Sequence, residues 1–203
     1  MIIKKITIYA GFNKDKQKEN FDRLDIISGD TVSIVGPTGS GKSSFVNDIE
    51  MLTQGDTITQ RKILINGKIP SSSYRQDASK NPIVLITQHT NFLADLTIEE
   101  FLRVHAKARN IKSKETMGKT IFLTNKLTGE KVNEKMRMTS LSGGQTRALM
   151  IADSIVIGQA PIVLLDEIEN AGIRQSHSVI PQPPGPSPHV LIQDVACFRI
   201  SSA

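Results

Sequence analysis

The sequence predicts an α/β domain built on a mostly parallel sheet, and three observations carry this prediction. Short apolar runs rich in β-branched residues alternate along the chain with stretches of helical spacing. A glycine-rich segment at 36–43 joins one such run to a helix. The hydrophobic content is 38% and the charged content is 22% over 203 residues, which favours a globular chain with a core over a disordered one.

The strands are predicted from short apolar runs bounded by turn-forming residues. Residues 2–9 are rich in β-branched side chains and roughly alternate between apolar and polar, as is typical of a strand. Residues 31–35 and 161–165 have the apolar composition of buried central strands. The runs 61–65 and 82–87 are further strand candidates.

The helices are predicted from apolar residues that recur every three to four positions. Helical spacing occurs directly after the glycine-rich segment, at 44–52, and again at 98–108 and 145–157. The stretch 91–140 contains no clear strand, so we expect a helical insertion there.

Composition excludes several classes of protein. The longest apolar runs, such as 162–165, are far shorter than the ~18 residues that a membrane span requires, and the first residues do not have a signal-peptide pattern. A single cysteine, Cys197, rules out an internal disulfide and suits a reducing cytosol. The net charge of +5 could indicate an anionic partner such as nucleic acid, a nucleotide or a lipid surface, but a solvated lysine-rich surface is favoured because no long block of like charge is present. With 4% aromatic residues and no Trp, nucleic acid is not an expected partner.

A phosphate-binding loop is predicted at residues 36–43, which match the pattern G-x-x-x-x-G-K-S between a predicted strand and a predicted helix. Glycines allow backbone N–H groups to turn inward around a phosphate, and the start of the helix adds the positive end of its dipole. We expect Lys42 to reach the β- and γ-phosphates of a nucleotide and the Ser43 hydroxyl to bind Mg²⁺. A glycine-rich turn without function is the alternative, and the flanking strand and helix argue against it.

A second candidate site lies where the apolar run 162–165 ends in Asp166 and Glu167. In open α/β folds, ligands bind at the carboxyl ends of the strands, which is where these two side chains are expected. One carboxylate can hold Mg²⁺, and the next can act as the general base for an attacking water. The alternative is a strand that ends in solvated acids.

One further motif indicates a family. Residues 141–145 are Leu141-Ser142-Gly143-Gly144-Gln145, and a predicted helix and then the acidic strand follow them. With the phosphate loop upstream, this order resembles the ATP-binding cassette (ABC) ATPases over residues 1–173. The resemblance implies the P-loop NTPase fold of ABC type, with a mostly parallel core sheet, an antiparallel β part near the N-terminus and a helical subdomain at about 91–145.

The resemblance also implies roles for individual residues. Gln88 would touch Mg²⁺ and the attacking water, Asp166 would serve Mg²⁺, and Glu167 would be the base. Residues 141–145 would contact the γ-phosphate of ATP held by a second subunit. Tyr9 and Phe12 are both candidates for stacking on adenine, and each could equally be a packing residue. The triphosphate would be wrapped by Gly36, Pro37, Thr38, Gly39, Ser40, Gly41, Lys42, Ser43 and Ser44.

The expected function is binding and hydrolysis of Mg·ATP by the nucleotide-binding subunit of a transporter, active as a head-to-tail dimer on the cytoplasmic face of a membrane. The membrane-spanning part would come from another polypeptide. Two alternatives remain open: a stand-alone ABC ATPase with a regulatory or nucleic-acid role, and a nucleotide-binding module with impaired turnover. Association with a membrane protein would favour the first interpretation, and salt-sensitive binding of DNA or RNA would favour the stand-alone ATPase.

The segment 174–203 departs from the family pattern. It contains five of the nine prolines and neither lysine nor glutamate, and the proline-rich run 181–188 cannot continue a helix or a central strand. The family's loop aspartate after the acidic pair and its switch histidine are both missing, because Arg174 follows Ile173 and residues 191–198 contain no histidine. We therefore expect either a disordered tail or sequence read out of frame, which the coding DNA would show.

Overall fold

The computed structural model describes residues 2–77, 80–87, 95–111, 113–166 and 190–194. These residues form two compact units, and each has its own hydrophobic core. The first unit comprises 2–85, 161–166 and 190–194, and the second comprises 86–160.

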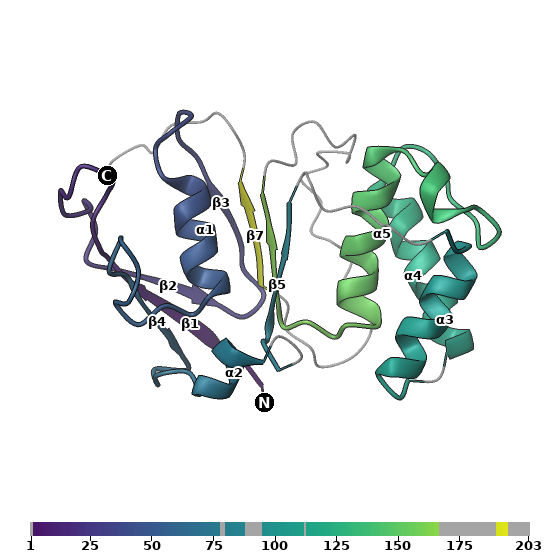
Figure 1. Cartoon of the computed structure of the whole chain (residues 1–203), viewed down its shortest axis with the longest axis horizontal. Coiled ribbons are helices and arrows are strands. Elements are labelled where there is room, and N and C mark those ends of the chain that lie inside the picture. The colour runs from purple at the N-terminus through teal and green to yellow at the C-terminus, as the bar shows by residue number, and fades with distance from the viewer. Residues whose placement is uncertain (1, 78–79, 88–94, 112, 167–189, 195–203) are drawn as a thin grey trace. The chain divides into compact units, whose positions relative to one another are not determined.

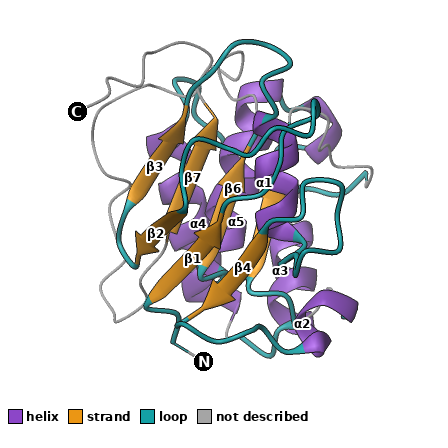
Figure 2. Cartoon of the chain, turned by 90° about the vertical axis from the view of Figure 1, so that its left-hand side faces the viewer, coloured by secondary structure: helices purple, strands orange, loops and turns teal. Residues whose placement is uncertain are grey.

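The first unit contains an antiparallel sheet of three strands. The order is β2-β1-β4, so β1 lies in the middle and pairs with both neighbours (Figure 2). The register places Ile6 opposite Ile26 on one side and opposite Ile65 on the other. The strands are β1 (Lys5–Tyr9), β2 (Arg23–Ile27) and β4 (Lys62–Ile65).

The same unit contains a second sheet, whose order is β3-β7-β6-β5. Strand β7 runs parallel to both β3 and β6. Together the two sheets confirm the predicted α/β fold with a mostly parallel core sheet and an antiparallel part near the N-terminus. The strands of this sheet are β3 (Thr31–Ile34), β5 (Ile83–Ile86), β6 (Ile162–Leu165) and β7 (Val190–Asp194).

Strand β7 lies within the segment 174–203, for which the sequence predicts either a disordered tail or residues read out of frame. Its first three residues, Val190, Leu191 and Ile192, are apolar, and two of them are β-branched, which suits a strand. Strand β7 lies between β3 and β6 and pairs with each of them over four residues. Proline-rich composition over 181–188 therefore did not reveal a short strand that begins two residues later.

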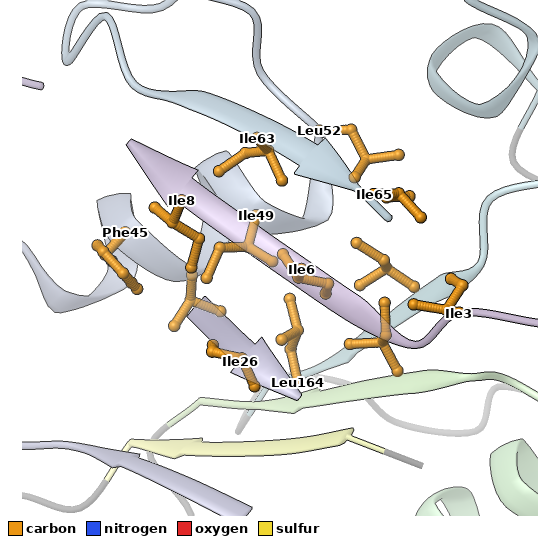
Figure 3. Packing of buried hydrophobic residues seen from close by; sticks show 13 residues of the cluster. Ile3, Ile6, Ile8, Ile26, Phe45, Ile49, Leu52, Ile63, Ile65 and Leu164 are labelled. Atoms are coloured by element: carbon orange, nitrogen blue, oxygen red, sulfur yellow. The ribbon is translucent and has the colours of Figure 1, made fainter. Parts of the chain in front are cut away.

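Helix α1 (Lys42–Glu50) contributes to the core of the first unit. Isoleucines dominate this core: Ile6 and Ile8 of β1 pack with Ile49 of α1 and with Leu164 of β6 (Figure 3). Burial of the apolar face of α1 therefore fixes the helix to which the glycine-rich segment leads. A short helix, α2 (Ser72–Gln76), follows β4.

The second unit is helical. Its helices are α3 (Ile98–Ala108), α4 (Ser113–Leu127) and α5 (Gly143–Val156), with a 3-10 turn, η1, at Met138–Ser140 (Figure 1). Leu102 of α3 and Leu149 of α5 are fully buried in its core. Nδ1 of His105 in α3 contacts both carboxylate oxygens of Asp153 in α5 at 2.9 Å, so the two helices also share a polar contact.

Candidate functional site

The phosphate loop connects β3 to α1, in the context that the sequence predicts. Gly39 and Gly41 have φ angles of +80° and +94°, a region that side chains with a β-carbon rarely adopt. Residues 37–40 are all exposed to solvent. The glycines therefore produce an open loop whose backbone can approach a ligand closely.

The start of α1 is free to bind an anion. Gly41 is the N-cap residue, no side chain caps the helix, and its first turn contains no acidic residue. The first N–H groups of a helix lack partners within the helix and carry the positive end of its dipole. An anionic group placed at this end would therefore gain both hydrogen bonds and favourable electrostatics.

Lys42 is positioned over the beginning of the loop. Its Nζ donates to the carbonyl oxygen of Gly36 at 2.9 Å and to that of Pro37 at 3.4 Å. Lys42 is also the first residue of α1, so its ammonium group and the helix start lie on the same loop. This arrangement places a cation beside the amides that would surround a phosphate.

Asp166 follows β6, whose four residues are all buried. Within the described part of the chain, its Oδ1 is buried and has no hydrogen-bond partner. An unpaired buried acceptor costs about 1–3 kcal/mol, so a ligand that satisfies it would be stabilising. Mg²⁺ in nucleotide sites is held by one or two carboxylates together with substrate phosphates, and Asp166 with the Ser43 hydroxyl offers the oxygen donors that this ion prefers.

The segment 141–145 forms the start of α5. Ser142 is the N-cap: its Oγ accepts from the N–H of Gln145 at 3.3 Å, and its own N–H donates to Oε1 of Gln145 at 2.9 Å. This reciprocal pair is a capping box, and it uses the buried side chain of Gln145 for helix stability. Gly143, the first helical residue, is exposed, so its backbone is accessible.

A buried ion cluster, which the sequence did not reveal, ties the loop 10–22 to α1. The guanidinium of Arg61 donates to Glu19 at 2.5 and 3.0 Å and to Asp48 of α1 at 2.6 Å. It also lies 4.9 Å from the ring centroid of Phe45 in α1. Burial raises the pKa of Glu19, but hydrogen bonds from Arg61 and from the N–H of Gly11, with the charge of Arg61, outweigh it and lower that pKa.

The two aromatic candidates lie at the beginning of this same loop. Tyr9 is the last residue of β1 and is 39% exposed, and Phe12 is 36% exposed. The N–H of Phe12 donates to the carbonyl of Thr59 at 2.7 Å, which fixes the backbone next to its ring. Both residues are therefore partly exposed, and neither belongs to the buried core cluster of the first unit.

A family model described as ABC transporter matches residues 21–170. The chain belongs to the ABC transporter family. This membership makes it an ATPase and confirms the resemblance drawn from the phosphate loop and residues 141–145.

Individual ABC relatives agree with this assignment. An uncharacterized ABC transporter ATP-binding protein from Methanocaldococcus jannaschii is 48% identical over 179 residues, which is 88% of this chain and 69% of the relative. The thiamine import ATP-binding protein ThiQ from Brucella abortus is 30% identical over 77% of this chain, and the chain spans 61% of its length.

Solved ABC structures share the fold. An ABC transporter ATP-binding protein from Pyrococcus furiosus has a TM-score of 0.66 at 16% identity, covering 96% of this chain and 92% of that one. The protein cbiO1 from Clostridium perfringens, part of the ABC transporter complex cbiONQ, has a TM-score of 0.61 at 18% identity, covering 95% and 78%. Within the described residues of this ABC chain, no helix is long and apolar enough to cross a membrane.

Part of the ABC site that the sequence predicts lies within one compact unit. The phosphate loop, Lys42, Ser43 and Asp166 all belong to the first unit, and residues 141–145 belong to the second. Gln88 and Glu167 lie outside the described residues.

Proposed function

We propose that the chain binds Mg·ATP at residues 36–43 and hydrolyses it as the nucleotide-binding subunit of an ABC transporter. The observation that carries the proposal is the buried, unpartnered Oδ1 of Asp166 in the same compact unit as an open, uncapped phosphate loop. A cation-binding carboxylate and a phosphate-binding helix start are the two parts that a Mg·nucleotide site needs.

The proposed roles follow from the chemistry of each side chain. Lys42 and the amides of the loop neutralise the triphosphate, and Ser43 and Asp166 hold Mg²⁺, which neutralises charge on the β- and γ-phosphates when bound. Gln88 orients the attacking water, and Glu167 accepts its proton. One of Tyr9 and Phe12 stacks on the adenine.

We further propose that two copies act together, head to tail. The exposed start of α5 at Ser142 and Gly143 then contacts the γ-phosphate of ATP held by the partner's phosphate loop. The names of the relatives, which include an import ATP-binding protein, support a membrane-spanning partner subunit and a position on the cytoplasmic face.

The test is a calorimetric titration of the chain with ATP, with and without Mg²⁺. We expect Mg²⁺ to tighten ATP binding at least tenfold, because the ion occupies the unpaired Asp166 oxygen. Asp166→Asn removes the charge of that ligand and should abolish most of the Mg²⁺ effect. Lys42→Ala should weaken ATP binding with or without Mg²⁺, because it removes a cation from the triphosphate.

Two results would contradict the proposal. One is a titration of the intact chain with millimolar Mg·ATP that shows no heat of binding beyond the heat of dilution. The other is an Asp166→Asn chain whose ATP affinity responds to Mg²⁺ as strongly as that of the unchanged chain. Thermal unfolding of each variant in the absence of nucleotide shows whether it is folded.

A further inference from the structure

We propose that Lys14 is a second cation of the nucleotide-phosphate site, acting from the loop 10–22 on phosphates held at residues 36–43. This inference rests on the proposed function. Its first support is a distance: Nζ of Lys14 lies 3.9 Å from the point where a β-carbon on Gly39 would stand. A lysine 25 positions earlier in the chain therefore brings its ammonium group to the phosphate loop.

The Lys14 ammonium group is available for a ligand. Its side chain is exposed, and among the described residues it takes part in no hydrogen bond or ion pair. The Lys42 ammonium group, in contrast, is engaged by the carbonyls of Gly36 and Pro37. Two cations thus reach one loop from different elements, and a polyphosphate would interact favourably with both.

The backbone around Lys14 is held in a closed turn. Oδ1 of Asn13 accepts from the N–H groups of Asp15 and Gln17, each at 2.9 Å, and the N–H of Asn13 donates to the carbonyl of Gln17 at 2.9 Å. An Asn side chain that bonds to the backbone two residues ahead is a typical turn-stabilising device. The turn therefore presents Lys14 from a fixed backbone position.

Contacts of Glu19 and Arg61 fix this turn relative to the phosphate loop. Glu19 accepts from the N–H of Gly11 at 2.9 Å and from the guanidinium of Arg61, and Arg61 also binds Asp48 on α1. Helix α1 begins at Lys42. The contacts therefore form a closed path from the phosphate loop through α1 and Arg61 to the loop 10–22, and back to Gly39 through Lys14.

The test compares two variants that remove the same charge from the same turn, Lys14→Gln and Lys16→Gln, together with Lys14→Arg. The dissociation constant for Mg·ATP is measured by calorimetry at several salt concentrations. A unit charge about 4 Å from a phosphate in water is worth about a fivefold change in affinity, so Lys14→Gln should weaken binding roughly fivefold. It should also flatten the dependence of the dissociation constant on salt, whereas Lys16→Gln should stay within about twofold of the unchanged chain and Lys14→Arg should bind as the unchanged chain does.

If the unchanged chain binds Mg·ATP but Lys14→Gln and Lys16→Gln have equal affinities and equal salt dependences, the inference about Lys14 is wrong and the proposed function stands. An unchanged chain that does not bind Mg·ATP would overturn the proposed function, and the inference with it. Equal melting temperatures for the two Gln variants show that a difference in affinity comes from the site and not from folding.

Discussion

The side chain of Arg61 connects the loop 10–22 to helix α1 within the first unit. It is 3% exposed and neutralises two carboxylates, Glu19 and Asp48, which come from different parts of the chain. A buried charge without a partner is strongly destabilising, so the three side chains depend on one another. We interpret the cluster as the device that keeps the loop 10–22 in place beside α1.

Replacing Arg61 should therefore make the folded chain less stable. We expect Arg61→Met to lower the free energy of unfolding by about 3 kcal/mol, because two carboxylates lose their partner. The matched control is Arg75→Met, since Arg75 pairs with Asp56 in a more exposed setting, and such a pair is worth about 1 kcal/mol or less. Urea titrations of both variants measure the difference.

The effect of Arg61→Met should also depend on pH. The pKa of Glu19 is lowered from 4.5 in the folded chain, so its stabilising contribution is present above pH 4.5 and is lost as the pH falls through the folded value. The destabilisation should consequently be largest near neutral pH and smaller in acid. Equal destabilisation by the two Arg variants at neutral pH, or a loss that does not change in acid, would argue against a coupled cluster.

The cluster also shows why residue-scale prediction from the sequence was incomplete. Motifs with short, fixed spacing, such as 36–43 and 141–145, can be recognised because their chemistry is local. Arg61 is 42 residues from Glu19 and 13 from Asp48, and no periodic pattern links the three positions. The approach of Lys14 to Gly39 likewise depends on the tertiary fold, because 25 positions separate the two residues in the sequence.

At the scale of elements, the sequence predicted that helices α1 and α5 form but placed their first residues too late. Helix α1 begins at Lys42, two residues before the predicted 44, and α5 begins at Gly143, two residues before the predicted 145. In both cases glycines precede or open the helix, and their poor helix propensity hides the true start. The amides that we propose to bind phosphate lie in these first turns, where the periodicity of apolar residues gives no information.

The two capping boxes of the second unit allow the role of Ser142 to be separated from helix stability. Thr97 caps α3 with Glu100 in the same way that Ser142 caps α5 with Gln145. Ser142→Ala and Thr97→Ala should each lower the free energy of unfolding by about 1 kcal/mol, measured by thermal unfolding. Only Ser142→Ala should also weaken ATP-dependent dimerisation, because only α5 is proposed to face the partner's nucleotide.

Two results would count against this separation. Equal loss of dimerisation in both variants would reduce the role of Ser142 to stability. Normal dimerisation in Ser142→Ala would show that its hydroxyl is not needed at the nucleotide.

For the whole molecule, the order of strand-like and helical segments predicted the class of fold, and the order of motifs predicted the family. The alternation of strands and helices was sufficient because apolar runs such as 162–165, which forms the fully buried interior strand β6, are easily recognised. Strand β7 was not predicted, because its partners are distant in the sequence. Its first residue is 159 positions after the first residue of β3 and 28 positions after that of β6. The pairing of β7 depends on contacts between segments that are distant in the sequence, and no local pattern contains them.

The central claim is that the phosphate loop of one copy and residues 141–145 of another act on the same ATP. Sedimentation velocity of Glu167→Gln, which lacks the proposed base and so should retain ATP, tests it most directly. We predict a dimer with Mg·ATP and a monomer with Mg·ADP, because only ATP carries the γ-phosphate that the start of α5 would contact. A monomer under both conditions, or the same dimer with both nucleotides, would contradict the account.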